Sequence, residues 1–179
     1  MGLRGILRYS GTALLAALIV GVPALALAAR RRGRTDHAAW WSAVAAGYLA
    51  AVAQIIGLRF GLRSWRWMGG LAAIKLEPLR TTRQVWAMGA WPFIYHAIGN
   101  AAWFAPLGAL LALRRPRRPA WIALAAGAAL SLTVECAQLL LGTGIPDVDD
   151  VLYNALGALL GWLAARAARK RRDSSSQSQ

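Results

Sequence analysis

The sequence predicts an all-α fold: a polytopic helical membrane bundle of about five transmembrane helices, with an interfacial amphipathic segment between the second and third. Hydrophobic residues make up 58% of the 179 residues, and the mean hydropathy is +0.42. Several apolar runs approach the length of about 20 residues that a helix needs to cross a bilayer. The net charge of +14 is gathered at the ends of these runs. Because this distribution is typical of membrane topology, we predict no nucleic-acid partner.

The first apolar run, residues 9–29, is followed by a cluster of arginines. Two interpretations stay open for it: an uncleaved anchor, or a cleaved signal peptide, because Ala26-Leu27-Ala28 resembles a cleavage site. The arginines favour the anchor, since basic residues tend to stay on the cytoplasmic side. The second run, residues 38–58, begins with Trp40 and Trp41, which favour a position at the membrane interface.

Residues 59–91 form a long connection in which basic residues alternate with tryptophans. We predict one or two amphipathic pieces that lie in the membrane interface, where tryptophan rings and long basic side chains are both favourable. A surface loop whose basic side chains merely extend to water is the alternative.

Three further apolar runs complete the predicted bundle, at residues 92–113, 120–141 and 151–165. Pro116 and Pro119 prevent the first of them from continuing into the second as one helix. A tight turn at residues 142–146 separates the last two runs.

The runs divide the chain into three predicted regions. Residues 1–37 are an N-terminal transmembrane anchor with a basic loop, and residues 38–168 are a membrane domain. Residues 169–179 are a basic cytoplasmic tail, which we predict to be disordered because it is polar throughout.

The charges of the connections predict the orientation. Segments 30–37, 114–118 and 166–172 are strongly basic, whereas the turn at 142–150 carries three aspartates and no basic residue. Because basic connections stay in the cytoplasm, we predict a multi-pass protein of the cell membrane with its N-terminus outside and its C-terminus cytoplasmic. The basic connection 59–91 then lies outside, where we expect it to contact anionic headgroups.

Polar residues interrupt the last two runs at regular spacings. Glu135 and Gln138 lie inside the fourth run, and Asp147, Asp149, Asp150 and Asn154 open the fifth. A carboxylate in hydrocarbon must be protonated, paired or reached by water, so these residues are candidates for a functional site. His96 and Asn100 enter the third run from the same side. We predict one outward-facing polar pocket, with Glu135 and Asp150 as catalytic candidates and His96, Asn100, Gln138, Asp147, Asp149 and Asn154 as lining residues.

Each of these residues also has a purely structural interpretation. Asp147 or Asp149 caps the fifth helix in this reading, with Asp150 in its first turn. Amide side chains then act as interhelical hydrogen-bond partners. The glycines allow helices to approach closely; they are Gly99, Gly108, Gly157 and Gly161. Both interpretations stay open from the sequence.

The spacing of the polar residues also resembles a known pattern. Glu135, Gln138, Asp147, Asp149, Asp150, Asn154 and Gly157 reproduce, without a gap, the C-terminal motif of the VanZ-like family. The segment from Gly99-Asn100 to Pro106-Leu107-Gly108 is similar to a second motif of that family, and residues 75–80 echo a third. The resemblance covers roughly residues 45–165. Gly144 stands where the family usually has arginine, and Lys75 and Leu79 stand in place of Asn and Phe.

The resemblance implies an envelope protein of the kind associated with decreased susceptibility to glycopeptide antibiotics such as teicoplanin, acting at the outer face of the membrane. The partners it implies are membrane lipids, lipid-linked envelope precursors or lipophilic glycopeptides.

Two other functions stay open. One is an intramembrane enzyme that acts on a lipid-linked envelope substrate, with Glu135 as general acid or base and the aspartates orienting a headgroup or water. The other is a non-catalytic lipid-binding or membrane-assembly module. Catalysis requires Glu135 and Asp150 to face one water-accessible cleft, whereas the structural role ties them to backbone amides or helix ends.

No cofactor and no metal ion is predicted. The acidic residues fit no standard calcium loop, although a divalent ion held by Glu135 and the aspartates is conceivable from their proximity. The sequence carries no zinc-ligand cluster, no phosphate-binding loop and no dinucleotide fingerprint.

Overall fold

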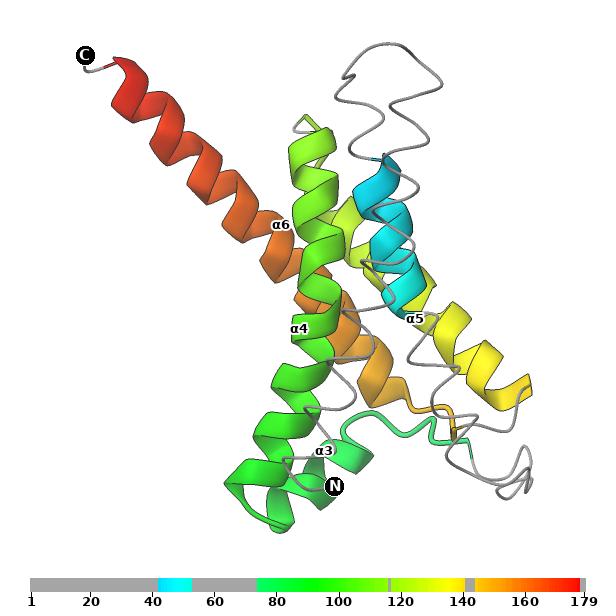
Figure 1. Ribbon diagram of the computed structural model, residues 1–179. Helices are drawn as coiled ribbons and strands as arrows, with labels where there is room; N and C mark the ends of the chain where they lie inside the picture. The colour runs from blue at the N-terminus through cyan, green and yellow to red at the C-terminus, as the bar shows by residue number, and fades with distance from the viewer. Residues whose placement is uncertain (1–41, 53–73, 116, 141–143, 178–179) are drawn as a thin grey trace. The chain divides into compact units, whose positions relative to one another are not determined.

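The computed structural model describes residues 42–52, 74–115, 117–140 and 144–177. Over these ranges the regular structure is helical: a helix at Ser42–Val52, followed by α3 (Arg80–Ala87), α4 (Ala90–Arg114), α5 (Trp121–Leu140) and α6 (Val148–Gln177) (Figure 1). The helix Ser42–Val52 belongs to one compact unit. Helices α3, α4 and α6, together with α5 up to Leu139, belong to another.

Three of the predicted apolar runs are confirmed as helices long and apolar enough to cross a membrane. They correspond to α4, α5 and α6. The second run is described only at residues 42–52, which are helical and bury Ala43, Ala51 and Val52. The first run, its basic loop, residues 53–73 and the turn at 141–143 lie outside the described residues.

Helix α4 ends at Arg114, two residues before Pro116. Arg115 has φ −133° and ψ 68°, outside the helical region. This residue precedes Pro116, whose ring disfavours a helical conformation in the residue before it.

Helices α4 and α6 cross with their backbones in direct contact (Figure 1). A Cβ atom added to Gly161 would lie 1.9 Å from the carbonyl oxygen of Ala105, and one added to Gly108 would lie 1.7 Å from that of Ala158. Gly157 is equally close to the backbone of Ala101. The predicted role of these three glycines in close helix approach is therefore confirmed. Around Gly99, in contrast, no atom of the described residues lies within 4 Å of an added Cβ.

Helix α5 packs against another side of α6. Its buried residues are Ala123, Gly127, Ser131, Glu135 and Gln138. Spacings of four and three place all of them on one face of the helix. A Cβ on Gly127 would lie 2.7 Å from the Cβ of Ala158 and 3.0 Å from the Cα of Ala155, so this face also packs closely against α6, although less closely than α4 does.

Helix α6 is longer than the fifth apolar run. Its start at Val148 is about 27 Å from Arg166 along the helix axis, close to the thickness of the hydrocarbon core. The helix then continues to Gln177. The prediction of a disordered tail from residue 169 is therefore corrected over residues 169–177. The basic residues there favour helix, and the hydroxyls of Ser174 and Ser175 donate back to carbonyls three residues earlier.

The glycine contacts lead to a stability prediction. We expect Gly161→Ala to lower the free energy of unfolding by about 3 kcal/mol, because the new methyl group meets backbone that has no freedom to move aside. Gly99→Ala is the matched control, since it lies in the same helix pair but faces open space. Thermal unfolding of the detergent-purified proteins measures both. Equal unfolding temperatures for the two variants would contradict the close contact.

Candidate functional site

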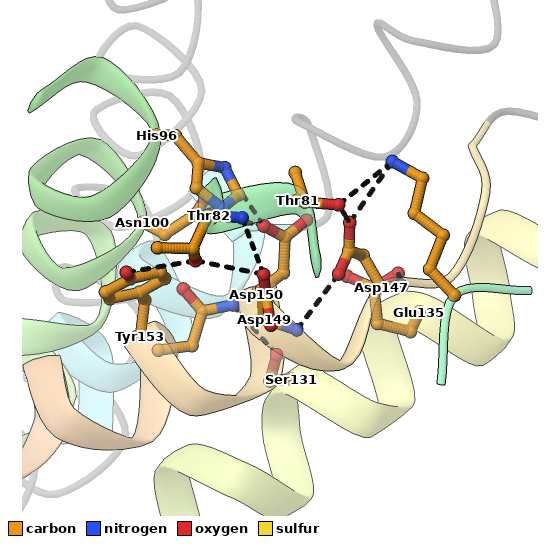
Figure 2. Close-up of polar contacts among 12 residues, drawn as sticks. Thr81, Thr82, His96, Asn100, Ser131, Glu135, Asp147, Asp149, Asp150 and Tyr153 are labelled. Atoms are coloured by element: carbon orange, nitrogen blue, oxygen red, sulfur yellow. Dashed lines mark hydrogen bonds and ion pairs between the residues drawn. The ribbon is translucent and has the colours of Figure 1, made fainter. Parts of the chain in front are cut away.

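The predicted site residues gather at the first turn of α6. Figure 2 shows side chains meeting there from the first turn of α3, the first half of α4, the second half of α5, and the start of α6. Lys75, from the segment before α3, joins them through Asp147. We call this group the α6 cluster; it comprises Lys75, Thr81, Thr82, His96, Asn100, Ser131, Glu135, Asp147, Asp149, Asp150, Tyr153 and Asn154.

Asp147 is the N-cap of α6. Its Oδ1 atom accepts a hydrogen bond of 3.0 Å from the backbone amide of Asp149, two residues later. This satisfies one of the amides that the first helical turn leaves without an intrahelical acceptor. The other oxygen, Oδ2, accepts bonds from Lys75 Nζ at 3.3 Å and from the Thr81 hydroxyl at 2.5 Å. The capping role predicted for Asp147 is present, and a cation accompanies it.

Two more amides at the start of α6 are satisfied by distant residues. The amide of Asp147 donates to Glu135 Oε2 on α5 at 3.3 Å. The amide of Val148 donates to the carbonyl of Lys75 at 3.0 Å, and the Lys75 amide donates to the carbonyl of Pro146 at 2.9 Å. Glu135, which is only 5% exposed, therefore holds the backbone at the beginning of the next helix.

Asp149 joins α3 to α6. It is fully buried, and it accepts bonds from the amide of Leu79 at 2.5 Å, the amide of Thr82 at 2.8 Å and the Thr82 hydroxyl at 2.9 Å. Leu79 is the N-cap residue of α3 and Thr82 is its third residue, and the leucine side chain makes no capping hydrogen bond. Asp149 thus caps α3 from a different helix. Leu79 adopts φ 62°, an uncommon conformation for leucine that directs its amide to this carboxylate.

Asp150 has different surroundings from the other carboxylates. Its Oδ1 accepts a bond of 2.5 Å from Asn100 Nδ2 and lies 3.6 Å from Nδ1 of His96. The side chain of Asp150 is 23% exposed and that of His96 is 14% exposed. The His96 ring packs edge-on against Tyr153, at 5.4 Å between centroids. Asp150 is therefore held by side chains of α4, at a place that is not sealed from solvent.

The remaining amide side chains lie deeper. Asn154 Nδ2 donates to the Ser131 hydroxyl at 2.8 Å, linking α6 to α5. Gln138 is buried on the same face of α5 as Glu135. Within the described residues, no group of three or more His, Cys, Asp or Glu side chains is arranged to hold a metal ion.

Five members of the α6 cluster were not predicted as site residues: Lys75, Thr81, Thr82, Ser131 and Tyr153. A signal existed for two of them. Ser131 lies four residues before Glu135, on the same helix face, and Tyr153 lies three residues after Asp150. Lys75 and the two threonines are about 70 positions away from the aspartates they contact. Spacing along the chain gives no signal for contacts at such a distance.

The role of Asp149 is testable. We expect Asp149→Ala to destabilise the protein by about 2 kcal/mol and to speed hydrogen exchange of the α3 amides, because two amides lose their acceptor in a buried place. Glu77→Ala is the control: it also removes a carboxylate from this region, but the Glu77–Arg83 pair is exposed and is expected to contribute little. Hydrogen exchange of the amides of residues 79–87, measured by mass spectrometry, compares the two variants with the wild type. Unchanged exchange in Asp149→Ala would refute the cap.

A comparison with known protein families identifies a family whose model includes the residues of the α6 cluster. A protein-family model described as VanZ/LLP1 matches residues 45–169, which contain the α6 cluster, the whole of α4 and α5, and α6 as far as residue 169. A search of curated proteins and a search of solved structures each returned no match. Since the family model covers more than half of the chain, this membrane protein belongs to the VanZ/LLP1 family.

Proposed function

We propose that this VanZ/LLP1 member is a five-span protein of the cell envelope whose α6 cluster faces the outside of the plasma membrane. It binds the polar part of an amphiphilic envelope ligand there: a lipid-linked precursor or a lipophilic glycopeptide such as teicoplanin. The observation that carries the proposal is the different environment of Asp150, which makes it the carboxylate best suited to meet a ligand.

The partners of the four carboxylates support this division. Asp147 and Asp149 accept bonds from helix amides, and Glu135 holds the amide of Asp147. Asp150 instead contacts the side chains of His96 and Asn100 and is the most exposed of the four. A ligand with amide or hydroxyl donors can reach such a carboxylate without unfolding a helix end, and a charged acceptor strengthens those hydrogen bonds.

The proposed topology rests on charge. Runs 9–29 and 38–58 add two spans to α4, α5 and α6, and the basic segments 30–37, 114–118 and 166–172 then lie in the cytoplasm. In this arrangement α3 is the amphipathic piece at the outer interface. Exposed Trp86 and Trp91 flank its end, as expected for side chains at headgroup level.

An intramembrane enzyme is the second candidate, and one observation favours it. His96 lies with Nδ1 towards Asp150, while its Nε2 is buried and bonded to no described residue. A carboxylate that orients an imidazole leaves the other nitrogen to take up a proton. In this version Asp150 and His96 form the acid–base pair, and Glu135, a catalytic candidate from the sequence, positions the start of α6.

The third function, a non-catalytic assembly module, is supported by Asp147, Asp149 and Asn154, because their bonds join helices. The amount of each variant in the membrane distinguishes this assembly role from ligand binding and from catalysis, because only the assembly role predicts loss of the protein itself.

Growth under teicoplanin tests the proposed site. We expect the wild-type protein to raise the inhibitory concentration and Asp150→Asn to return it to that of cells without the protein, at unchanged membrane level. The charge-matched control is Asp173→Asn, which removes an exposed carboxylate from the far end of α6. Full protection by Asp150→Asn would remove Asp150 from the site. Equal loss of protein and protection would instead support the assembly role, and no protection by the wild type would refute the glycopeptide ligand.

The orientation is tested by labelling intact cells with a membrane-impermeant thiol reagent in a Cys136→Ala background. We expect labelling of Gln84→Cys, on the exposed side of α3, and none of Ser174→Cys, near the end of α6, until the membrane is permeabilised. Labelling of Ser174→Cys in intact cells would reverse the proposed topology.

A further inference from the structure

A cavity lies at the end of the bundle opposite to the α6 cluster. With a volume of about 260 Å³, it opens between the end of α4, the start of α5 and the middle of α6; it is lined by Leu111, Arg115, Arg118, Ile122, Ala123 and Trp162. Trp162 is about 21 Å along α6 from Val148, so this cavity is separate from the acidic residues.

The lining of the cavity is divided by chemistry. Four of the lining residues are apolar and two are basic. The apolar ones are Leu111, Ile122, Ala123 and Trp162, and the basic ones are Arg115 and Arg118. The amide of Arg118 donates to the carbonyl of Arg115 at 3.1 Å, so one turn of backbone supplies both arginines of the lining. A further cation, Arg166, lies 5.3 Å from the centroid of the Trp162 ring.

Most acidic side chains of the described residues lie at the other end of the bundle. Of the seven acidic residues in the chain, Glu77, Glu135, Asp147, Asp149 and Asp150 lie in or beside the α6 cluster. Among the described residues, neither Arg115 nor Arg118 forms an ion pair with a carboxylate. Within the described part of the chain, the cavity lining therefore offers positive charge to a ligand.

We propose that this cavity is a binding site for an anionic membrane phospholipid, with its phosphate at Arg115 and Arg118 and part of an acyl chain against Leu111, Ile122 and Trp162. The ligand follows from the chemistry of the lining. An apolar wall takes hydrocarbon, and paired guanidinium groups bind phosphate through several hydrogen bonds. Basic pockets between transmembrane helices are a known way of holding anionic headgroups. This inference does not depend on the ligand proposed for the α6 cluster.

Native mass spectrometry of the detergent-purified protein tests the site. The protein is mixed with phosphatidylglycerol and phosphatidylcholine of identical acyl chains, and the bound fractions are compared. We expect a preference for phosphatidylglycerol in the wild type, lowered about fivefold by either Arg115→Gln or Arg118→Gln. Arg117→Gln is the matched control, since Arg117 is exposed in the same connection but does not line the cavity. Equal binding of the two lipids by the wild type, or an equal loss in Arg117→Gln, would overturn the proposal.

Two further arms identify the part of the lipid that is recognised. Ile122→Trp fills the apolar wall, so we expect it to reduce phosphatidylglycerol binding even though both arginines remain. An unchanged unfolding temperature shows that it has folded, and if it does not fold the arginine variants decide the matter. Inorganic phosphate in large excess should displace little lipid. Full displacement by phosphate would overturn the proposal, because it would indicate a site for a free anion.

Discussion

The structure depends on how the first turn of α6 is satisfied. A helix that begins inside an apolar bundle presents amides with no intrahelical acceptor, and each buried amide without a partner costs free energy comparable to a lost hydrogen bond. Here the amides of Asp147, Val148 and Asp149 are bonded to Glu135, Lys75 and Asp147 in turn. One acceptor comes from α5, one from the segment before α3 and one from α6 itself. The start of α6 is therefore where three parts of the chain are fixed to one another.

This constraint explains why so many carboxylates occur in so small a volume. Asp147, Asp149 and Glu135 all bond to backbone amides, and Asp147 also pairs with Lys75. Their charges are therefore compensated by helix ends and by one cation, as the positive end of a helix dipole allows. Asp150 lies in the same turn but turns to His96 and Asn100. Asp147, Asp149 and Glu135 thus fix the backbone that carries Asp150, and they use other hydrogen-bond partners than Asp150 does. A binding site at Asp150 therefore requires that these helix caps stay intact.

The apolar part of the bundle is held together by close packing of small residues. Lipid is as apolar as leucine, so burial alone gives membrane helices little reason to associate, and close packing must supply the attraction. Gly108, Gly157 and Gly161 bring the α4 and α6 backbones into contact, and Gly127 does the same for α5. Many large apolar side chains, such as Leu132, Leu160 and Ile98, remain exposed, as expected for surfaces that face hydrocarbon. Apart from Phe104, the buried apolar residues in the described part of the chain are alanines and one valine, so small side chains fill most of this core.

The sequence by itself determined the helical class, three of the membrane helices, and the close glycine contacts between α4 and α6. It also indicated part of the α6 cluster, namely its four carboxylates with His96, Asn100 and Asn154. These features depend on local composition and on spacings of three and four, which a helix converts directly into shared faces. Only the tertiary structure decided which group each polar residue contacts. The bonds from Asp149 to Thr82 and from Asp147 to Lys75 cross about 70 positions, and they exist only because packing brings α3 onto the end of α6. The same packing made Glu135 a support for a helix end and left Asp150 beside His96, because hydrogen-bond partners are chosen by proximity in the folded bundle and not by order along the chain.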